Sequence, residues 1–458
     1  MKVIICGAGQ VGSNIAHYLA TEDNDVTVVD QSPALIGKLT DTLDCRGVTG
    51  HASNPDVLKE AGADDADMLI AVTYTDEINM VACQVAHSLF NVPTKIARIR
   101  SQSYLAPEWA NLYTRENLPI DVIISPEIEV ARAVMRRLTV PGATDMIPLC
   151  GGKVRLVGIR CEDDCPLIHT PLRQLTQLFP DLHIVVVGMI RDGKPIIPTG
   201  NDQFLPGDEA YIVVDEKHMS RTLVAFGHEE LEARRLLIFG GGNIGLFLAQ
   251  QLEREFPWVN AKIIENNEQR ARQIASQLTK TTVLCGDVRD QELLMEANVS
   301  AAETVVAVTN DDETNILGSL LAKRMGSKRA VTLINKSLYE PLINNLGIDV
   351  VVNPRNITVS QILQQVRKGR IHSVHSLREG FGELIEAEAL ATSPLVGAPL
   401  RDVKMPAGVL IGALVRDGQV ISPRGGTIIE PNDRVVLFAA SDSVSKVEKM
   451  FSVRLEFF

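Results

Sequence analysis

Short apolar runs alternate with amphipathic segments along the first part of the chain. Residues 2–6 read KVIIC and stop at glycines, and residues 10–20 then carry apolar positions at helical spacing. Further apolar runs, which we expect to be strands, cover residues 26–30, 67–72, 95–99 and 121–124. Helices are expected between them, for example at 77–89. This alternation predicts a parallel sheet covered by helices on both faces.

The pattern occurs twice. Residues 71–79 read AVTYTDEIN and residues 307–315 read AVTNDDETN, while IRDGKPIIP at 190–198 returns as VRDGQVISP at 415–423. Such self-similarity indicates duplication of a two-part unit. The predicted class is α/β, with two tandem Rossmann-like parallel-sheet domains, each followed by a small α+β lobe. The predicted domains are 1–140, 141–227, 228–371 and 372–458.

The smaller lobes differ in pattern from the larger domains. In the first lobe, β-rich runs at 153–159, 184–190 and 209–214 are separated by turns such as Arg191-Asp192-Gly193. The junction before the second lobe reads KGRIHSVHS. We expect it to be a solvated linker, since the spacing of His372 and His375 alone is weak evidence for a metal site.

A glycine-rich turn joins the first strand to the first helix. The first glycine makes the turn, the second lets a pyrophosphate approach the backbone, and the third packs helix on strand. Asp30 ends the second strand, where a carboxylate can accept both ribose hydroxyls of an adenosine and would repel a 2′-phosphate. NAD is therefore favoured over NADP. The residues of this loop are Gly7, Ala8, Gly9, Gln10, Val11 and Gly12.

The second copy repeats the loop and the acid, with Glu265 in the place of Asp30. The strand, the helix and the acid agree in both copies, which predicts a Rossmann fold twice. The alternative is that one or both loops bind nothing. The residues of the second loop are Gly240, Gly241, Gly242, Asn243, Ile244 and Gly245.

Three further side chains follow strands at the same edge of the first sheet, where ligands of open α/β folds bind. Thr73 and Tyr74 follow the fourth strand, and for Tyr74 a purely structural turn role is the alternative. Arg98 ends the fifth strand among apolar residues. It either contacts a ligand phosphate or pairs with a buried acid.

Composition narrows the classes of partner. The 458 residues are 45% hydrophobic and 22% charged, with a net charge of −12. An acidic surface repels phosphate backbones, so no nucleic acid partner is expected. Free cysteines suit a reducing cytoplasm. The N-terminus reads as a core strand and not as a signal peptide, and no apolar run is long enough to span a bilayer.

The duplication favours a sensor over an enzyme. A dehydrogenase needs a substrate domain that supplies an acid or base beside the nicotinamide. No candidate acid or base recurs between the two small lobes, so no catalytic residue is predicted. An NAD-dependent oxidoreductase with a duplicated dinucleotide-binding domain is the alternative.

The motifs together resemble those of the RCK (regulator of potassium conductance) family, in the tandem form of the regulatory subunits of bacterial Trk potassium-uptake systems. The resemblance covers the whole chain and is most specific from Ala61 to Arg100. It implies that the protein binds NAD(H), and ATP or ADP. It also implies a homo-oligomeric ring, a tetramer, which gates a potassium-transporting membrane subunit from the cytoplasmic face of the membrane. The motifs that carry it are GAGQVG (7–12), AGADDADM (61–68), IARIR (96–100), GGGNIG (240–245), TNDDE (309–313) and LAKRMG (321–326).

By the same resemblance, the first site is formed by Gly7–Val11, Asp30, Thr73, Tyr74 and Arg98. The second is formed by Gly240–Gly245, Glu265, Thr309 and Asn310.

Two positions depart from symmetry between the copies. Asp287 of the second copy is an acid, whereas the residue at the same position of the first copy is His51. No metal site is predicted. Leu333 stands at the position of Arg98, so the first site is expected to favour the more highly charged nucleotide. The helical segments 81–90 and 316–325 offer apolar faces for self-association.

Overall fold

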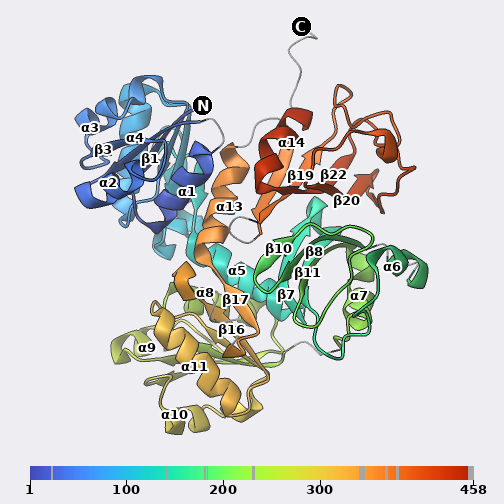
Figure 1. The fold of residues 1–458 in the computed structure, drawn as a ribbon. Helices are drawn as coiled ribbons and strands as arrows, with labels where there is room; N and C mark the ends of the chain where they lie inside the picture. The colour runs from blue at the N-terminus through green and yellow to red at the C-terminus, as the bar shows by residue number, and fades with distance from the viewer. Residues whose placement is uncertain are drawn as a thin grey trace. The chain divides into compact units, whose positions relative to one another are not determined.

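The computed structural model describes residues 1–21, 24–140, 142–179, 182, 184–229, 233–339, 346–366, 370–377 and 381–451 (Figure 1). The chain forms two compact units. Unit 1 consists of Met1–Glu129 and Pro354–Gln365. Unit 2 consists of Val130–Asn353 and Val366–Phe458.

Unit 1 holds a six-stranded parallel sheet in the order β3-β2-β1-β4-β5-β6. Its strands are β1 (Lys2–Cys6), β2 (Asp25–Asp30), β3 (Arg46–Thr49), β4 (Met68–Ala71), β5 (Thr94–Arg98) and β6 (Val122–Ile124). Its helices are α1 (Gln10–Ala20), α2 (Pro33–Thr40), α3 (Pro55–Glu60), α4 (Asp76–Phe90) and α13 (Pro354–Val366). This order is that of a dinucleotide-binding sheet.

The central strands are mostly apolar, above all β1 and β4, because both faces of the sheet are buried there. Ile4 and Cys6 point to one face, where they join a hydrophobic core with residues of α3 and α4 such as Leu58 and Cys83. Their neighbour Ile5 points to the other face and is also fully buried. A parallel sheet covered by helices on both sides requires this continuous apolar pattern.

Unit 2 repeats the sheet in the order β14-β13-β12-β15-β16-β17. Its strands are β12 (Arg235–Phe239), β13 (Asn260–Glu265), β14 (Thr282–Cys285), β15 (Thr304–Ala307), β16 (Arg329–Leu333) and β17 (Val350–Val352). The accompanying helices are α8 (Asn243–Glu255), α9 (Glu268–Ala275), α10 (Gln291–Glu296) and α11 (Asp312–Arg324).

The last helix of each parallel-sheet domain packs with the other copy. Helix α13 follows the second sheet in sequence but belongs to unit 1, where Arg355 Nε donates to Gln10 Oε1 at 3.1 Å. Helix α5 (Pro126–Leu138) follows the first sheet, and from Val130 onward it belongs to unit 2. There Arg329 Nη1 donates to the Arg137 carbonyl at 3.3 Å. The compact units therefore do not follow the four predicted domains, whose limits stay a prediction.

Each copy also contains a small lobe with a five-stranded, antiparallel sheet, which confirms the predicted fold class. The first lobe holds β7 (Ala143–Leu149), β8 (Val154–Arg160), β9 (Val185–Arg191), β10 (Lys194–Ile196), β11 (Glu209–Asp215), α6 (Leu172–Leu178) and α7 (Met219–Ala225). The second holds β18 (Ile371–Ser376), β19 (Gly382–Glu388), β20 (Val409–Arg416), β21 (Gln419–Ile421), β22 (Arg434–Ala440) and α14 (Val444–Phe451).

The junction expected to be a linker is in fact a strand. His372 and His375 lie in β18, which pairs with β19 in an antiparallel ladder. Only Val374 of this strand is buried, and His372 Nε2 lies 3.4 Å from Glu388 Oε2. Strand β18 is at the edge of its sheet, where polar side chains are tolerated, so the hydrophobic pattern misleads.

The two small lobes pack sheet against sheet. Val213 and Tyr211 of the first lobe share one hydrophobic core with Phe381 and Phe438 of the second. The fit is close, because a Cβ added to Gly188 would lie 2.4 Å from Phe381 Cζ. The shared core means that neither lobe buries this face alone.

An arginine–aspartate pair is buried in each small lobe at the positions related by the repeat. Arg191 Nη2 lies 2.7 Å from Asp208 Oδ2, and Arg416 Nη2 lies 2.8 Å from Asp433 Oδ2. Each guanidinium also donates through Nε to the other carboxylate oxygen at 2.9 Å. Both aspartates are almost wholly buried, so each depends on its arginine for charge compensation.

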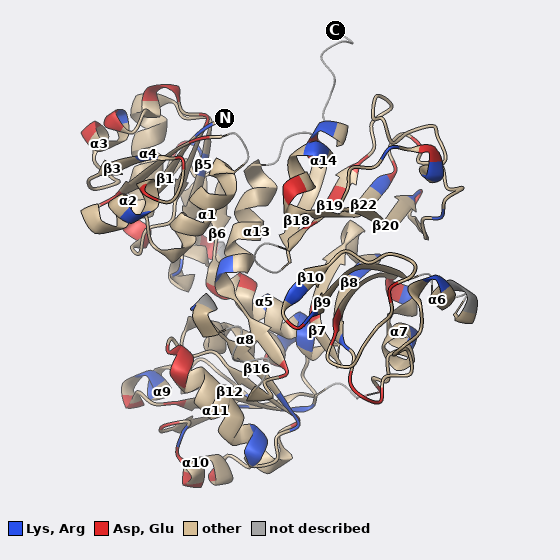
Figure 2. Cartoon of the chain, viewed as in Figure 1, with Lys and Arg blue, Asp and Glu red and all other residues tan. Residues whose placement is uncertain are grey.

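Charged residues are spread over the surface. Figure 2 shows acidic and basic residues interspersed over the elements in this view. Across the described ranges, every helix falls short of the combined length and apolarity needed to cross a membrane.

The substitution Arg416→Leu should destabilise the second small lobe. It leaves the Asp433 carboxylate buried without its cation. We expect this to lower the free energy of unfolding by about 2 kcal/mol. The value is at the lower end for such pairs because water reaches the guanidinium. Scanning calorimetry should show a lower melting temperature. Arg401→Leu is the matched control, since Arg401 and Asp402 are exposed and 3.9 Å apart. Equal melting temperatures for the two variants would contradict the assigned role.

Candidate functional site

The first glycine-rich loop is shaped by two positions that cannot carry a side chain. Gly7 has φ +112°, and a Cβ there would lie 3.1 Å from the Thr73 backbone nitrogen. A Cβ on Gly12 would lie 1.8 Å from the Gly7 carbonyl oxygen. Gly9 differs, because an added Cβ meets nothing within 4 Å. The middle glycine therefore borders open space at the N-terminus of α1, where a ligand can approach the backbone.

Asp30 closes this loop from the neighbouring strand. Its carboxylate accepts a hydrogen bond from Ala8 N at 2.7 Å and another from Ser32 N at 2.8 Å. An ionised carboxylate can accept about four hydrogen bonds, so acceptor capacity remains for ligand hydroxyls. The loop and the strand end are thus held in the geometry that the ribose-binding hypothesis requires.

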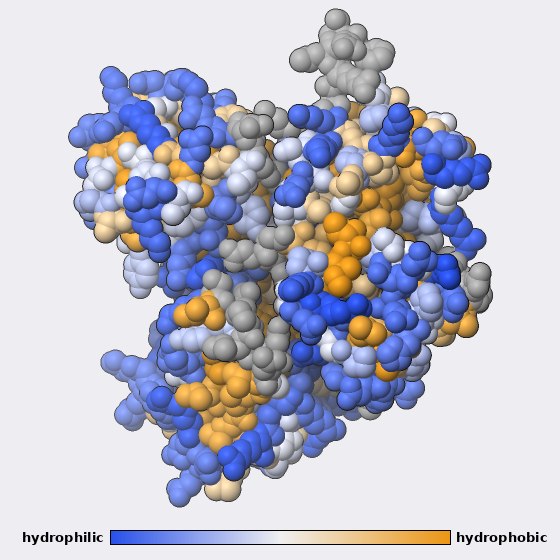
Figure 3. Space-filling view, viewed as in Figure 1, coloured by the Kyte–Doolittle hydropathy of each residue, from blue (hydrophilic) through white to orange (hydrophobic). Residues whose placement is uncertain are grey.

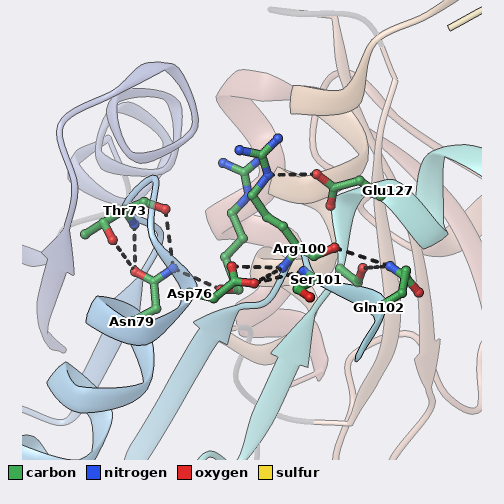
Figure 4. Close-up of polar contacts among 9 residues, drawn as sticks. Thr73, Asp76, Asn79, Arg100, Ser101, Gln102 and Glu127 are labelled. Carbon is green, nitrogen blue, oxygen red and sulfur yellow. Dashed lines mark hydrogen bonds and ion pairs between the residues drawn. The ribbon is translucent and has the colours of Figure 1, made fainter. Parts of the chain in front are cut away.

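A buried asparagine ties together the next two strand ends (Figure 4). Asn79 Oδ1 accepts from Thr73 N at 2.9 Å and from Thr73 Oγ1 at 2.7 Å. Asn79 Nδ2 donates to the Arg98 carbonyl at 2.9 Å. Thr73 is therefore fixed at the edge of the sheet by its own side chain, and the side chain of Asn79 is engaged by the protein itself.

Asp76 performs a similar task at the start of α4. Its carboxylate accepts from Arg100 N at 3.0 Å and from Ser101 N at 2.8 Å, and the residue is buried. The acid therefore holds the loop after β5 against the helix, in addition to complementing the helix dipole. Figure 4 shows both contacts.

Tyr74 and two arginines form the outer part of the first site. Tyr74 is 84% exposed, and its ring lies 5.1 Å from the Arg100 guanidinium carbon. Arg100 Nε pairs with Glu127 Oε1 at 2.9 Å. The Nε of Arg98 is buried and finds no acceptor among the residues that the structure describes, and burial lowers the pKa of this guanidinium. The neighbouring acid is thus paired with Arg100, a residue that the sequence analysis did not single out.

The second copy repeats the glycine loop and the acid at the end of the neighbouring strand. Gly240 has φ +103°, and a Cβ on Gly245 would lie 2.0 Å from its carbonyl oxygen. Glu265 accepts from Gly241 N at 2.7 Å and from Asn267 N at 2.8 Å. Asn243 begins helix α8, and Ile244 follows it, as Gln10 and Val11 do in α1.

The hydrogen bonds that Asn79 makes to two strand ends are also repeated in the second copy. Asn315 Oδ1 accepts from Thr309 N at 2.9 Å, and its Nδ2 donates to the Leu333 carbonyl at 3.0 Å. Leu333 thus occupies the structural position of Arg98, as the sequence comparison predicted.

A cavity of about 770 Å³ opens at this edge of the second sheet. It brings together five of the predicted residues: Gly240, Gly242, Glu265, Thr309 and Asn310. Arg270, from the first turn of α9, and Arg289, from the loop after β14, also line it. The second site therefore has cations, although not at the position of Arg98. The sequence analysis missed both, since no local pattern distinguishes them from surface arginines.

Within the described ranges, three or more His, Cys, Asp or Glu side chains do not come together in a group that could hold a metal ion.

The family models that match the chain are those of the TrkA-N domain, over residues 3–126 and 236–354, and the TrkA-C domain, over residues 156–227 and 384–452. The Trk system potassium uptake protein TrkA of Azorhizobium caulinodans is 55% identical over 458 residues, covering 100% of both chains. The protein of the same name from Vibrio alginolyticus is 43% identical over 455 residues, covering 98% of each.

Solved structures share the fold. The structure titled "GsuK channel bound to NAD" has a TM-score of 0.60 at 16% identity, covering 99% of this chain and 79% of that chain. A structure of GsuK bound to ADP has a TM-score of 0.50 at 16% identity, covering 80% of this chain and 69% of that chain.

Two glycines of the first loop, Gly12 and Gly9, should respond differently to alanine. In Gly12→Ala the new methyl collides with the Gly7 carbonyl, so overpacking of about 1–3 kcal/mol should exceed the gain in helix propensity and lower the melting temperature. Gly9→Ala should cost less, about 0.5–1 kcal/mol, because its Cβ is unopposed and only the N-cap preference for glycine over alanine is lost.

Gly9→Ala should nonetheless weaken dinucleotide binding, since its methyl fills the space in front of the helix N-terminus. Scanning calorimetry and ligand titration on both variants measure the two effects. A Gly9→Ala protein with full affinity would show that the loop is not a binding surface.

Proposed function

The chain belongs to the TrkA family of Trk-system potassium-uptake proteins, and we propose that it is a cytoplasmic regulatory subunit that binds NAD(H) at both glycine-rich loops and gates a membrane potassium transporter. The observation that supports this most strongly is the repeated closure of a glycine loop by a carboxylate from the adjoining strand end, at Asp30 and at Glu265.

The geometry suits an adenosine ribose and a pyrophosphate. Each carboxylate can accept ribose hydroxyls and would repel a 2′-phosphate, which favours NAD(H) over NADP(H). The unpaired N–H groups and the positive end of helix α1 or α8 face the position of the phosphates. The remaining residues of the proposed first site are Thr73, Tyr74 and Arg98, and those of the second are Thr309 and Asn310.

The protein is not an enzyme. Its relatives are named as potassium-uptake proteins, which rules against the oxidoreductase alternative. Occupancy of the sites is then a signal. ATP and ADP are further proposed ligands, and the GsuK complex with ADP shows that a protein of this fold accommodates an adenine mononucleotide.

A route from ligand to conformational change starts at Glu127. This acid lies in the first turn of α5 and pairs with Arg100. A ligand phosphate that attracts Arg98 and Arg100 would weaken that pair. Helix α5 continues from unit 1 into unit 2, so it is the proposed path from the first site to unit 2.

The proposed partner is a Trk-type membrane subunit, which would hold the protein at the inner face of the cell membrane. Shifting a gate from mostly closed to mostly open requires a ligand preference of about 5.5 kcal/mol. Several sites in a ring, proposed here to be a tetramer, would share this requirement.

NADH should stabilise the protein without being consumed. At a ligand concentration of 100 times Kd, binding adds about 2.7 kcal/mol to the folded state, which a thermal-shift assay detects. Asp30→Ala and Glu265→Ala should each weaken binding at one site by about 1–3 kcal/mol, which calorimetry can separate. Unchanged NADH affinity in both variants would refute the ribose role, and steady oxidation of NADH with a small organic substrate would refute the sensor.

Apolar helix faces support self-association. Val81 and Leu89 of α4 are exposed, and Leu317 of α11 is 54% exposed. Figure 3 shows a hydrophobic area over α11. We propose that a second copy of the chain covers these faces, since contiguous exposed apolar surface marks interaction sites.

The purified protein should therefore have a mass in solution above the 50.0 kDa of one chain. Leu317→Asp should shift the distribution towards smaller species, because it places a charge in the covered face. Light scattering after size exclusion at micromolar concentration measures both masses. Arg324→Gln, at an exposed position of the same helix, is the polar control. A strictly monomeric wild-type protein would contradict the proposed assembly.

A further inference from the structure

Arg270 borders the second cavity in a fixed position. Its Nε donates to the Gly241 carbonyl at 2.8 Å, and its Nη1 donates to Gln273 Oε1 at 3.0 Å. Both partners are neutral, so these contacts orient the guanidinium without cancelling its charge. The side chain comes from the first turn of α9, directly after the strand that ends in Glu265.

Arg289 borders the same cavity from the next strand. Its Nε and Nη2 donate to the two oxygens of Asp287 at 2.9 and 2.6 Å, which fixes the plane of the guanidinium. Both residues of this pair line the cavity. Two planar cations are thus held on neighbouring loops, after β13 and after β14, which are adjacent strands.

The first copy has neither arginine. Ser32 and Asn267 are matching N-caps, because each accepts from the backbone three residues later, at Leu35 and Arg270. Arg270 therefore corresponds to Leu35.

The second arginine is matched in the same way. Gly50 N and Gly286 N donate to the carbonyls of Asp30 and Glu265, and counting three residues onward pairs Ser53 with Arg289.

The position of a bound nucleotide follows from the carboxylate. If Glu265 accepts the ribose hydroxyls, the phosphates lie towards the glycine loop and the base points away from it. The base then lies between the loops that follow β13 and β14, which carry Arg270 and Arg289. Guanidinium planes stack on aromatic rings and attract them electrostatically.

We propose that Arg270 and Arg289 form an arginine clamp for the adenine ring in the second site. The inference rests on the proposed nucleotide-binding function and specifies its ligand. Because the clamp acts on the adenosine end, the second site takes adenosine mononucleotides, and AMP is sufficient for binding. The first site, with Leu35 and Ser53 in these positions, has no clamp, so AMP alone should not bind there.

The test is calorimetric titration of AMP and of NADH into the full-length protein. Wild type should bind AMP at one site per chain. Arg270→Leu with Arg289→Ser, which installs the first-copy residues, should weaken AMP binding at least tenfold and leave NADH binding at the first site intact. Arg270→Lys keeps the charge but not the planar group, so it should lose most of the effect of Arg270. Leu35→Ala is the control in the first copy and should leave AMP affinity unchanged.

Placing the two arginines in the first copy tests the proposal by a gain of AMP binding, which misfolding cannot produce. Leu35→Arg with Ser53→Arg should create a second AMP site per chain. Unchanged AMP affinity in the double variant of the second copy, with two NADH sites retained, would overturn the clamp and leave the proposed function standing. Failure of wild type to bind either nucleotide would overturn both.

Discussion

A buried side-chain amide sets the geometry on which each candidate site depends. Asn79 binds the backbone after β4 and the carbonyl at the end of β5, and Asn315 makes the same contacts in the second copy. The glycine turn lies against the residue fixed in this way, because a Cβ added to Gly7 would lie 3.1 Å from Thr73 N and one added to Gly240 would lie 3.1 Å from Thr309 N. An amide is suited to this role since it both donates and accepts. Without it, the backbone groups at two strand ends, after β4 and at the end of β5, would lose these partners.

On this common frame the two sites distribute charge differently. The first has Arg98 and Arg100 at the end of β5, on the phosphate side of the glycine loop. The second has Leu333 there and keeps its arginines on the side of the strand-end acid. Under the proposed function, two sites with the same backbone would respond to different parts of a nucleotide. The comparison of sequences alone identified the loss of one cation but not its replacement from another element.

The fold class and both glycine cradles could be predicted because their signals are local: an apolar strand, a spaced run of glycines, and an acid at the next strand end. The strand β18 could not, because His372, Ser373, His375 and Ser376 leave too few apolar residues to show a period of two. The sequence also could not predict that α5 and α13 each pack against the other copy. The pattern of an amphipathic helix shows which face is buried but not which domain covers that face. Arg270 differs from a surface arginine only by its contact with the Gly241 carbonyl, which no sequence pattern contains.

The face-to-face packing of the two small lobes has a consequence for how the copies can diverge. Strand β9 contacts β20 and β22, while β11 contacts β20, so equivalent strands meet in the reciprocal manner of a two-fold interface. A chain with one copy would form this interface with an identical molecule, and any mutation would alter both halves at once. Joining the copies in one polypeptide removes that constraint. Each half can accumulate its own substitutions while the shared core stays complementary, so the residues around the two glycine loops can differ, as Arg98 and Leu333 do.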